Sequence, residues 1–259
     1  MELRAGRTTV HFAEHGDGAP VIVLHGAGVD HREVEACFEP SFDTAGGWRR
    51  IYPDLPGMGR TAAPDSIRSA DDVLETLIDF ARAVTDGQPY VLMGHSAGAY
   101  YARAMAATEP AQVRGLALVC PLLPAPGAVP EHQVVEGSGD LGDVSFRRYF
   151  VVQTPEMLER HERFVAPGAA LADWSASARI GERWQLAARD ESPYDGPTLI
   201  VAGRLDSTVG YEAAADLLGR YAHASLAVLD GAGHALPHEQ PDVVRALVLD
   251  WLARVERAG

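Results

Sequence analysis

Short runs of apolar residues dominate the hydrophobic pattern of the chain. Within each run, polar and apolar positions do not alternate. This pattern predicts strands that are buried on both faces, as in a parallel sheet covered by helices. Five runs have this character: residues 21–24, 90–93, 116–119, 198–202 and 226–229. Residues 49–53 form a weaker run, and residues 8–14 are predicted to form an earlier strand at the edge of the sheet.

Helical patterns lie between these runs. Ser69 can cap a helix that continues to residue 84, with apolar side chains recurring every three or four positions. Asp71 and Asp72 occupy its first turn, where the helix dipole favours acidic groups. Further helices are predicted at residues 97–108, 211–220 and 241–256. Because strands and helices alternate, we expect an α/β fold with a mostly parallel central sheet and helices on both faces.

The alternation stops between residues 121 and 193. Clusters of Pro and Gly are followed there by short helix-like pieces that carry several aromatic residues. Compact domains rarely contain more than about 15 residues without regular structure, so we interpret this stretch as an inserted helical lid. The predicted core then consists of residues 1–120 and 194–259, and the lid, residues 121–193, follows the sixth strand.

Composition narrows the classes of function. The 259 residues include 36 acidic and 22 basic side chains, a formal charge of −14, which disfavours nucleic acid and anionic membranes as partners. No Lys occurs, so a Schiff-base enzyme, a P-loop NTPase and a lysine general base are excluded. Cys37 and Cys120 are interpreted as buried thiols in a reducing cytosol, although one disulfide is formally possible. The residues after Met1 lack an apolar leader pattern, which favours a cytoplasmic location.

The motif with the clearest chemistry is Gly94-His95-Ser96-Ala97-Gly98. It directly follows a predicted strand and directly precedes an Ala-rich helix, the context that a nucleophile elbow requires. The turn is so tight that small residues must flank Ser96. Its hydroxyl then projects from the sheet edge at a helix N-terminus, where negative charge is favoured. Ser96 is therefore the predicted nucleophile.

A serine hydroxyl needs a base to remove its proton. His234 lies in a Gly-rich loop just after the run 226–229 and is the predicted base. His238 could suggest a metal-binding pair with His234, but Pro237 interrupts a helix between them and no Glu follows His234 as zinc proteases require. We therefore expect His238 to be a surface or loop residue and predict no metal site and no cofactor.

The base needs a carboxylate that orients its imidazole. Asp206 follows the run 198–202 and precedes His234 in sequence, so it is the predicted partner. The end of the strand before the lid, another position used for this role, offers no carboxylate. Asp230 is closer to His234 in sequence but is interpreted as a turn former. Along the chain, Ser96 comes first, Asp206 second and His234 third, and this sequence order is typical of one class of Ser-His-Asp triads.

The oxyanion hole is expected to use backbone N–H groups. Ala97 follows the nucleophile and supplies one donor, and Ala27, in the loop after the first buried run, supplies the other. His25 is interpreted as a structural residue that holds this loop by hydrogen bonds. The loop lacks the third Gly of a dinucleotide-binding motif, which argues against a Rossmann site.

These motifs together resemble the α/β-hydrolase superfamily, specifically its lid-bearing serine hydrolases with a G-H-S-x-G elbow. The resemblance extends over nearly the whole chain. It rests on these segments: His25-Gly26, residues 54–60, the elbow, residues 203–206 and Gly233-His234. Residues 54–60 resemble a turn signature of the family, with no catalytic role expected. Ser96 distinguishes the chain from haloalkane dehalogenases and epoxide hydrolases, which carry Asp at that position.

Departures from the family pattern lie outside the three predicted catalytic residues. Thr61 stands where Ser is usual, Ala99 stands where a second Gly often follows the elbow, and Gly210 stands where many relatives have Pro.

The function predicted from the sequence is hydrolysis of a small or medium, largely uncharged carboxylic ester. The alternatives are a hydrolase that cleaves a C–C bond in a ring-cleavage product and a non-catalytic ligand-binding member of the fold. Arg147, Arg148 or Arg179 facing Ser96 would favour the C–C hydrolase, because such a residue could bind a substrate carboxylate. The expected partner is a small-molecule substrate; a homodimer remains possible.

Overall fold

The computed structural model of the chain describes residues 1–125, 127–137, 139–187 and 194–258. Its centre is an eight-stranded sheet in the order β1-β2-β4-β3-β5-β6-β9-β10. The strands are β1 (Glu2–Ala5), β2 (Thr8–His15), β3 (Ala19–Leu24), β4 (Trp48–Pro53), β5 (Tyr90–His95), β6 (Val113–Val119), β9 (Thr198–Gly203) and β10 (Ala224–Leu229). From β4 to β10 all neighbouring strands are parallel, whereas β1–β2 and β2–β4 pair antiparallel. The predicted α/β class is confirmed.

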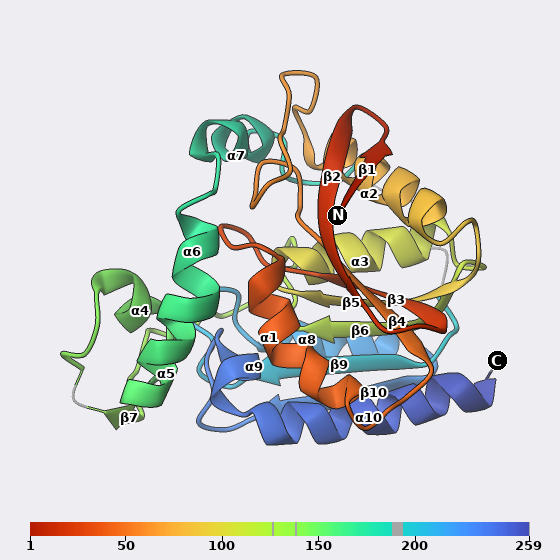
Figure 1. Cartoon of the computed structure of the whole chain (residues 1–259). Helices are drawn as coiled ribbons and strands as arrows, with labels where there is room; N and C mark the ends of the chain where they lie inside the picture. The colour runs from red at the N-terminus through yellow and green to blue at the C-terminus, as the bar shows by residue number, and fades with distance from the viewer. Residues whose placement is uncertain (126, 138, 188–193, 259) are drawn as a thin grey trace.

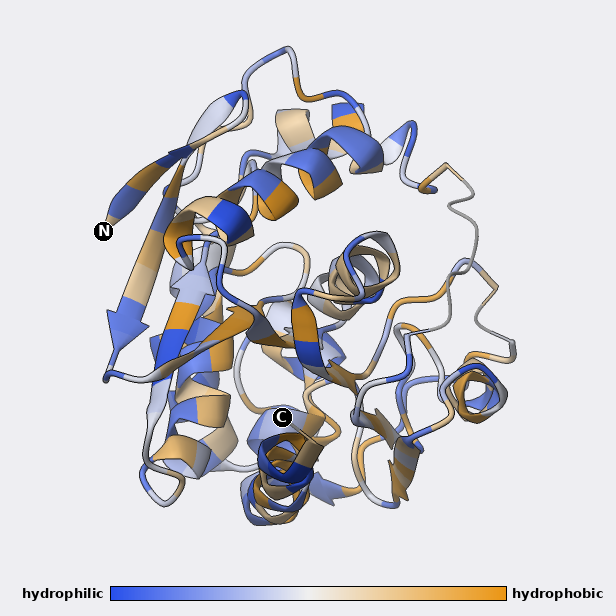
Figure 2. Cartoon of the chain, turned by 90° about the vertical axis from the view of Figure 1, so that its right-hand side faces the viewer, coloured by the Kyte–Doolittle hydropathy of each residue, from blue (hydrophilic) through white to orange (hydrophobic). Residues whose placement is uncertain are grey.

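Helices cover both faces of the sheet (Figures 1 and 2). One face packs against α2 (Ala70–Val84) and α3 (Ala97–Thr108), and the other against α1 (His31–Phe42) and α10 (Pro241–Ala258). Successive residues of β3 alternate between the two apolar layers, because neighbouring side chains of a strand point to opposite faces. Ser69 caps α2 as predicted, with its hydroxyl accepting the Asp72 N–H.

The two edges of the sheet differ from the sequence prediction. Residues 8–14 were expected at the edge, but β1 lies outside β2 and pairs with it. The four residues of β1 are too few and too polar to stand out as an apolar run. β10 was expected to be buried on both faces, yet it contains exposed residues, among them Val228. It forms the other sheet edge, where no further strand covers it.

Two helices also differ from prediction. α1 was not predicted, because acidic residues and Pro40 interrupt its apolar pattern, but Asp30 caps it by accepting the Arg32 N–H. The predicted helix 211–220 is shorter and divides into α8 (Glu212–Asp216) and a 3₁₀ turn, η2 (Leu217–Gly219). The four-residue α9 (Leu236–Glu239) precedes α10.

Residues 121–193, here called the inserted segment, lie between β6 and β9 in sequence. Their described parts contain two-residue strands and short helices: β7 (Glu136–Gly137), α4 (Val144–Tyr149), β8 (Val152–Gln153), α5 (Pro155–Arg160), the π-helical η1 (His161–Val165), α6 (Ala166–Ala169) and α7 (Trp174–Gly181). α4, α5, α6 and α7 lie beyond one end of the sheet (Figure 1). Part of the stretch interpreted as a lid, residues 126, 138 and 188–193, falls outside the described residues.

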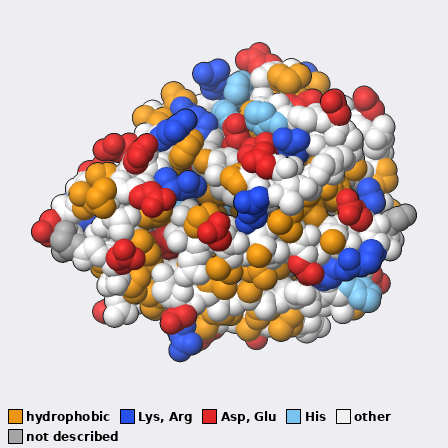
Figure 3. Space-filling view, turned by 60° about the horizontal axis from the view of Figure 1, so that its bottom comes forward, with side chains coloured by type: hydrophobic (Ala, Val, Ile, Leu, Met, Phe, Trp, Pro, Cys, Tyr) orange, Lys and Arg blue, Asp and Glu red, His pale blue; other side chains and the backbone are white. Residues whose placement is uncertain are grey.

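The surface charges and the two cysteines can be compared with what the composition indicated. Figure 3 shows acidic and basic side chains intermixed on one face, with small hydrophobic areas between them. Within the described part of the chain, no helix has both the length and the apolar character that crossing a membrane requires. Cys37 and Cys120 are buried and unpaired, and burial raises the pKa of both thiols well above its usual range.

Candidate active site

Ser96 lies in the sharp turn between β5 and α3. Its backbone has φ +54° and ψ −117°, a left-handed φ that non-glycine residues rarely adopt. The neighbouring glycines allow this turn: a Cβ at Gly94 would lie 2.4 Å from the Gly98 carbonyl carbon, and a Cβ at Gly98 would lie 2.2 Å from the Leu24 carbonyl oxygen. The Gly residues of the motif are therefore required by backbone contact.

The structure brings the three predicted catalytic side chains together. The Ser96 hydroxyl lies 2.9 Å from His234 Nε2, and His234 Nδ1 lies 2.8 Å from Asp206 Oδ2. Ser96 follows β5, Asp206 follows β9 and His234 follows β10, so the carboxyl ends of three strands supply one site. All three residues are buried, with Ser96 and His234 slightly exposed. This order of contacts can move a proton from Ser96 to His234 while Asp206 holds the imidazole.

Asp206 is held rigidly. Its second oxygen, Oδ1, accepts the backbone N–H groups of Thr208 and Val209 at 2.9 and 3.0 Å. Burial by itself would raise the pKa of Asp206, but the charge and hydrogen bond of His234 and the two N–H donors together lower this pKa below its usual value. Asp206 is therefore an anion that can stabilise an imidazolium. Asp230, by contrast, is exposed, and its backbone carbonyl accepts a hydrogen bond from Gln240.

The loop after β3 lies against the nucleophile. A Cβ on Gly26 would lie 3.3 Å from the Ser96 Cβ. His25 holds this loop: its Nδ1 donates to the Gly26 carbonyl at 2.7 Å, and its Nε2 accepts the Leu55 N–H at 3.0 Å. Burial lowers the pKa of His25, which keeps the ring neutral and suits this one-donor, one-acceptor arrangement. The structural interpretation of His25 is confirmed.

The two residues predicted to form the oxyanion hole border Ser96 from different sides. Ala97 is the first residue of α3, where a backbone N–H has no partner within its own helix. Ala27 is an exposed residue of the loop that contains Gly26. Their joint role remains a prediction.

The position of His238 differs from the sequence prediction. It was expected at the surface or in a loop, yet it is completely buried in α9 and its Nδ1 accepts a hydrogen bond from Arg160 Nε at 3.2 Å. α9 packs against α1 and α5, which turns this side chain inward. A polar residue next to a proline gave no signal of this burial.

Three further polar residues near the site were not identified from the sequence. Glu239 accepts the backbone N–H of Gly233, at 2.8 Å, and those of Val151 and Val152, and so ties the His234 loop to the inserted segment. Glu33 and His95 lie behind the site and contact each other. A signal was available for His95, because a histidine at the end of a fully buried strand requires a polar partner.

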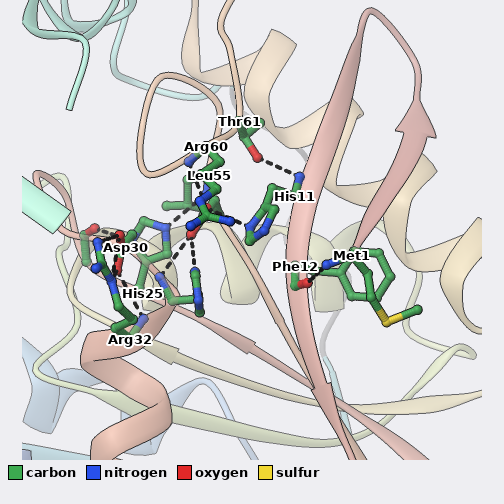
Figure 4. Close-up of polar contacts among 12 residues, drawn as sticks. Met1, His11, Phe12, His25, Asp30, Arg32, Leu55, Arg60 and Thr61 are labelled. Atoms are coloured by element: carbon green, nitrogen blue, oxygen red, sulfur yellow. Dashed lines mark hydrogen bonds and ion pairs between the residues drawn. The ribbon is translucent and has the colours of Figure 1, made fainter. Parts of the chain in front are cut away.

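Several potential metal ligands are engaged in hydrogen bonds. His95, Cys120 and His234 have ligating atoms within 4.8 Å of one another, but both nitrogens of His234 already contact Ser96 and Asp206. His11 and His31 also come close to Asp54, and each donates from Nδ1 to one of its oxygens (Figure 4).

Asp54 organises the turn signature at residues 54–60. It also accepts the Arg60 N–H, and hydrogen bonds from His31 help to hold its pKa well below its usual range although burial opposes this. These contacts identify Asp54 as the residue that holds this turn in place.

A family model for the alpha/beta hydrolase family matches residues 21–247. The chain belongs to the alpha/beta hydrolase family. The predicted superfamily resemblance is therefore confirmed. Among solved structures, an alpha/beta superfamily hydrolase from Oenococcus oeni PSU-1 is 26% identical, with a TM-score of 0.89 and 99% of each chain covered. A thermophilic esterase from Thermogutta terrifontis is 21% identical with a TM-score of 0.70, covers 98% of each chain and shares the fold.

Curated relatives of this alpha/beta hydrolase are hydrolases named for different substrates. A 2-hydroxymuconate semialdehyde hydrolase from Pseudomonas sp. (strain CF600) is 27% identical over 98% of this chain and 93% of its own. An (E)-2-((N-methylformamido)methylene)succinate hydrolase from Acinetobacter baylyi is 20% identical over 97% of both chains.

Proposed function

We propose that the protein is a serine hydrolase that cleaves a small or medium, largely uncharged carboxylic ester through an acyl-enzyme. The observation that carries this proposal is the continuous chain of hydrogen bonds from Asp206 through His234 to Ser96, at 2.8 and 2.9 Å. A serine in this arrangement is activated for attack on a carbonyl carbon.

In the proposed reaction, His234 Nε2 takes the Ser96 proton while the hydroxyl oxygen attacks the ester carbonyl. Asp206 stabilises the imidazolium that forms. The N–H groups of Ala27 and Ala97 bind the oxyanion, and His234 then protonates the leaving alcohol. A water molecule, deprotonated by His234, attacks the acyl-enzyme and releases the acid and the free Ser96 hydroxyl.

Apolar side chains of the inserted segment support an uncharged substrate. The Trp174 ring lies against the loop that contains Ala27. A Cβ placed on Gly28, the next residue of this loop, would be 2.9 Å from a carbon of the Trp174 ring. The Tyr149 ring packs on His234 with a centroid distance of 5.9 Å, and Val151 contacts the backbone at Gly233. We infer that this segment acts as a lid whose apolar groups border the substrate.

C–C bond hydrolysis is the second candidate, because relatives named for ring-cleavage products match nearly the whole chain. The arginines that would favour it have other positions. Arg179 donates to the backbone carbonyls of Ile67 and Ala63, and Arg147 donates to the Gly142 carbonyl. Arg148 is exposed. The observed contacts therefore favour an ester over a substrate held by a carboxylate–arginine pair.

The test is turnover of short- and medium-chain aryl esters, thioesters and a ring-cleavage product by wild type and Ser96→Ala. We expect ester hydrolysis by wild type and a loss of about 10⁴-fold in kcat/KM for Ser96→Ala, with unchanged thermal unfolding. Turnover of the ring-cleavage product alone would establish the second candidate. Ester hydrolysis by Ser96→Ala at the wild-type rate would contradict the nucleophile assignment.

A further inference from the structure

A buried carboxylate lies directly behind the candidate site. Glu33 belongs to α1 and is completely buried. One of its oxygens, Oε1, is approached by the Tyr149 hydroxyl at 3.3 Å, His95 Nδ1 at 3.2 Å and His238 Nε2 at 3.6 Å. These three groups come from α4, β5 and α9, so four separate elements meet at this one carboxylate.

Hydrogen-bond partners fix the position of the protons around Glu33. The Arg160 guanidinium can only donate, so His238 Nδ1 accepts from it and the proton of His238 is on Nε2, on the side of Glu33. Burial lowers the pKa of His238, which keeps this ring neutral. Tyr149 is also neutral, because burial raises the pKa of its hydroxyl well above its usual value.

His95 lies between two acceptors. Its Nε2 is 3.1 Å from the backbone carbonyl of His234, which can only accept, and its Nδ1 faces Glu33. The contact of Nδ1 with Glu33 does not have hydrogen-bond geometry, but an anionic Glu33 at 3.2 Å favours a proton on Nδ1 as well as on Nε2. Burial opposes both charges, yet Glu33 raises the pKa of His95, and His95 together with His238 lowers the pKa of Glu33 far below its usual range.

Other ionisable groups near the pair do not replace either charge. Cys37 lies beside Glu33 on α1, and burial keeps it a neutral thiol. The negative charge of Asp206 also raises the pKa of His95 and so favours its protonated form. The Arg160 guanidinium reaches Glu33 through His238.

His95, the partner of Glu33, lies next to His234, the candidate base. His95 directly precedes Ser96 in sequence, and its ring centre is 5.0 Å from that of His234. The Nε2–H group of His95 donates to the His234 backbone carbonyl and so holds the His234 backbone in place.

We propose that Glu33 and His95 form a buried ion pair that positions His234, the general base of the proposed reaction. This inference rests on the proposed function, because it assigns the pair a role in the same site. Glu33 and His95 act here as positioning residues and do not touch the substrate.

The first arm of the test needs no catalysis. In ¹⁵N NMR of wild type, we expect His95, assigned through its covalent connection to its own backbone amide, to be protonated on both ring nitrogens at pH 7.5. Glu33→Gln preserves the shape of the side chain but removes its charge, so His95 should become neutral at the same pH. A neutral His95 in wild type would overturn the proposal, whether or not the variants fold and whether or not an ester is hydrolysed.

The second arm measures pH profiles of ester hydrolysis. For Glu33→Gln, we expect the kcat/KM profile to shift along the pH axis relative to wild type, because the charges that face His234 change. The KM should change little, because the pair lies behind the base. Glu33→Asp, which keeps the charge, should recover part of the shift. The matched control is Glu35→Gln on the same helix, where Glu35 pairs with His15; its profile should equal that of wild type.

A Glu33→Gln profile that coincides with wild type would overturn the proposal, as would an equal loss of kcat at every pH in both Glu33 variants. Failure of the proposed function itself would be recognised separately, by the absence of turnover in wild type together with an unlabelled Ser96 after treatment with a fluorophosphonate.

Discussion

The strand ends that supply the candidate site and the inserted segment that borders it are built differently. Ser96, Asp206 and His234 follow neighbouring strands whose positions are fixed by ladder hydrogen bonds and by apolar layers on both faces. In the inserted segment α5, η1 and α6 follow one another without a break over residues 155–169, but α4 and α7 have only six and eight residues. Isolated helices of this length are not stable on their own.

Several polar contacts and some apolar packing hold the inserted segment to the core. Arg179 donates to carbonyls before α2, the Asp173 N–H donates to the Gly57 carbonyl, and the Leu186 N–H donates to the Tyr100 hydroxyl. A small apolar cluster with Phe146 adds to them. The comparison shows that the core positions the strand ends that carry the catalytic side chains, while the inserted segment contacts His234 through Tyr149 and the His234 loop through Glu239.

The largest predicted effect follows from replacing core residues of the site. Asp206→Asn should lower kcat/KM by about 10⁴-fold, because the amide cannot stabilise the imidazolium and favours the wrong tautomer of His234. Steady-state kinetics and circular dichroism of the same preparation check this. An activity within tenfold of wild type would contradict the role of Asp206.

Replacing one glycine in the core and one in the inserted segment compares the effects of the two regions on the free energy of unfolding. Gly98→Ala forces a Cβ against the backbone carbonyls of Leu24 and His25 and should lower the free energy of unfolding by about 3 kcal/mol. The matched control is Gly181→Ala in α7, where a Cβ would meet open space. It should be neutral or raise the free energy by about 0.5 kcal/mol. Urea unfolding measures both changes, and equal losses would contradict the comparison.

Acidification should destabilise the core through buried histidines. Burial holds the pKa of His25 and His238 below the usual 6.5. As the pH falls below about 6.5, the unfolded chain binds protons that these folded residues do not. The free energy of unfolding should therefore decrease, by about 1.4 kcal/mol per pH unit for each such residue until its folded pKa is reached.

Urea unfolding at pH 7.5 and 5.5 checks this decrease. His25→Gln should make it smaller, whereas His132→Gln, an exposed position in the inserted segment, should leave it unchanged. A decrease that is as large in His25→Gln as in wild type would argue against a neutral buried His25.

The smallest predicted effect concerns the attachment of the inserted segment. Arg179→Met removes donors to the carbonyls of Ile67 and Ala63 and should cost about 1 kcal/mol in local stability. Hydrogen exchange of α7 amides should become faster, while exchange in β5 stays unchanged. Faster exchange in β5 would show that the two regions are more tightly coupled than their contacts suggest.

The difference between the regions also explains what the sequence could predict. Ser96, Asp206 and His234 lie within short motifs that directly follow buried strands, so local patterns locate them. Glu33 could not be assigned in this way, because its partner His95 is 62 positions away and α1 has an interrupted apolar pattern. β1 is too short and too polar to stand out as an apolar run, and the burial of His238 depends on packing between elements that are distant in sequence.

The most direct test of the account is to label the wild-type protein with a fluorophosphonate and locate the adduct by peptide mass spectrometry. The hydrogen-bonded chain from Asp206 to Ser96 predicts one adduct, on the Ser96 hydroxyl, that is absent from Ser96→Ala. No adduct on wild type, or an adduct on another residue, would contradict the claim that Ser96 is an activated nucleophile.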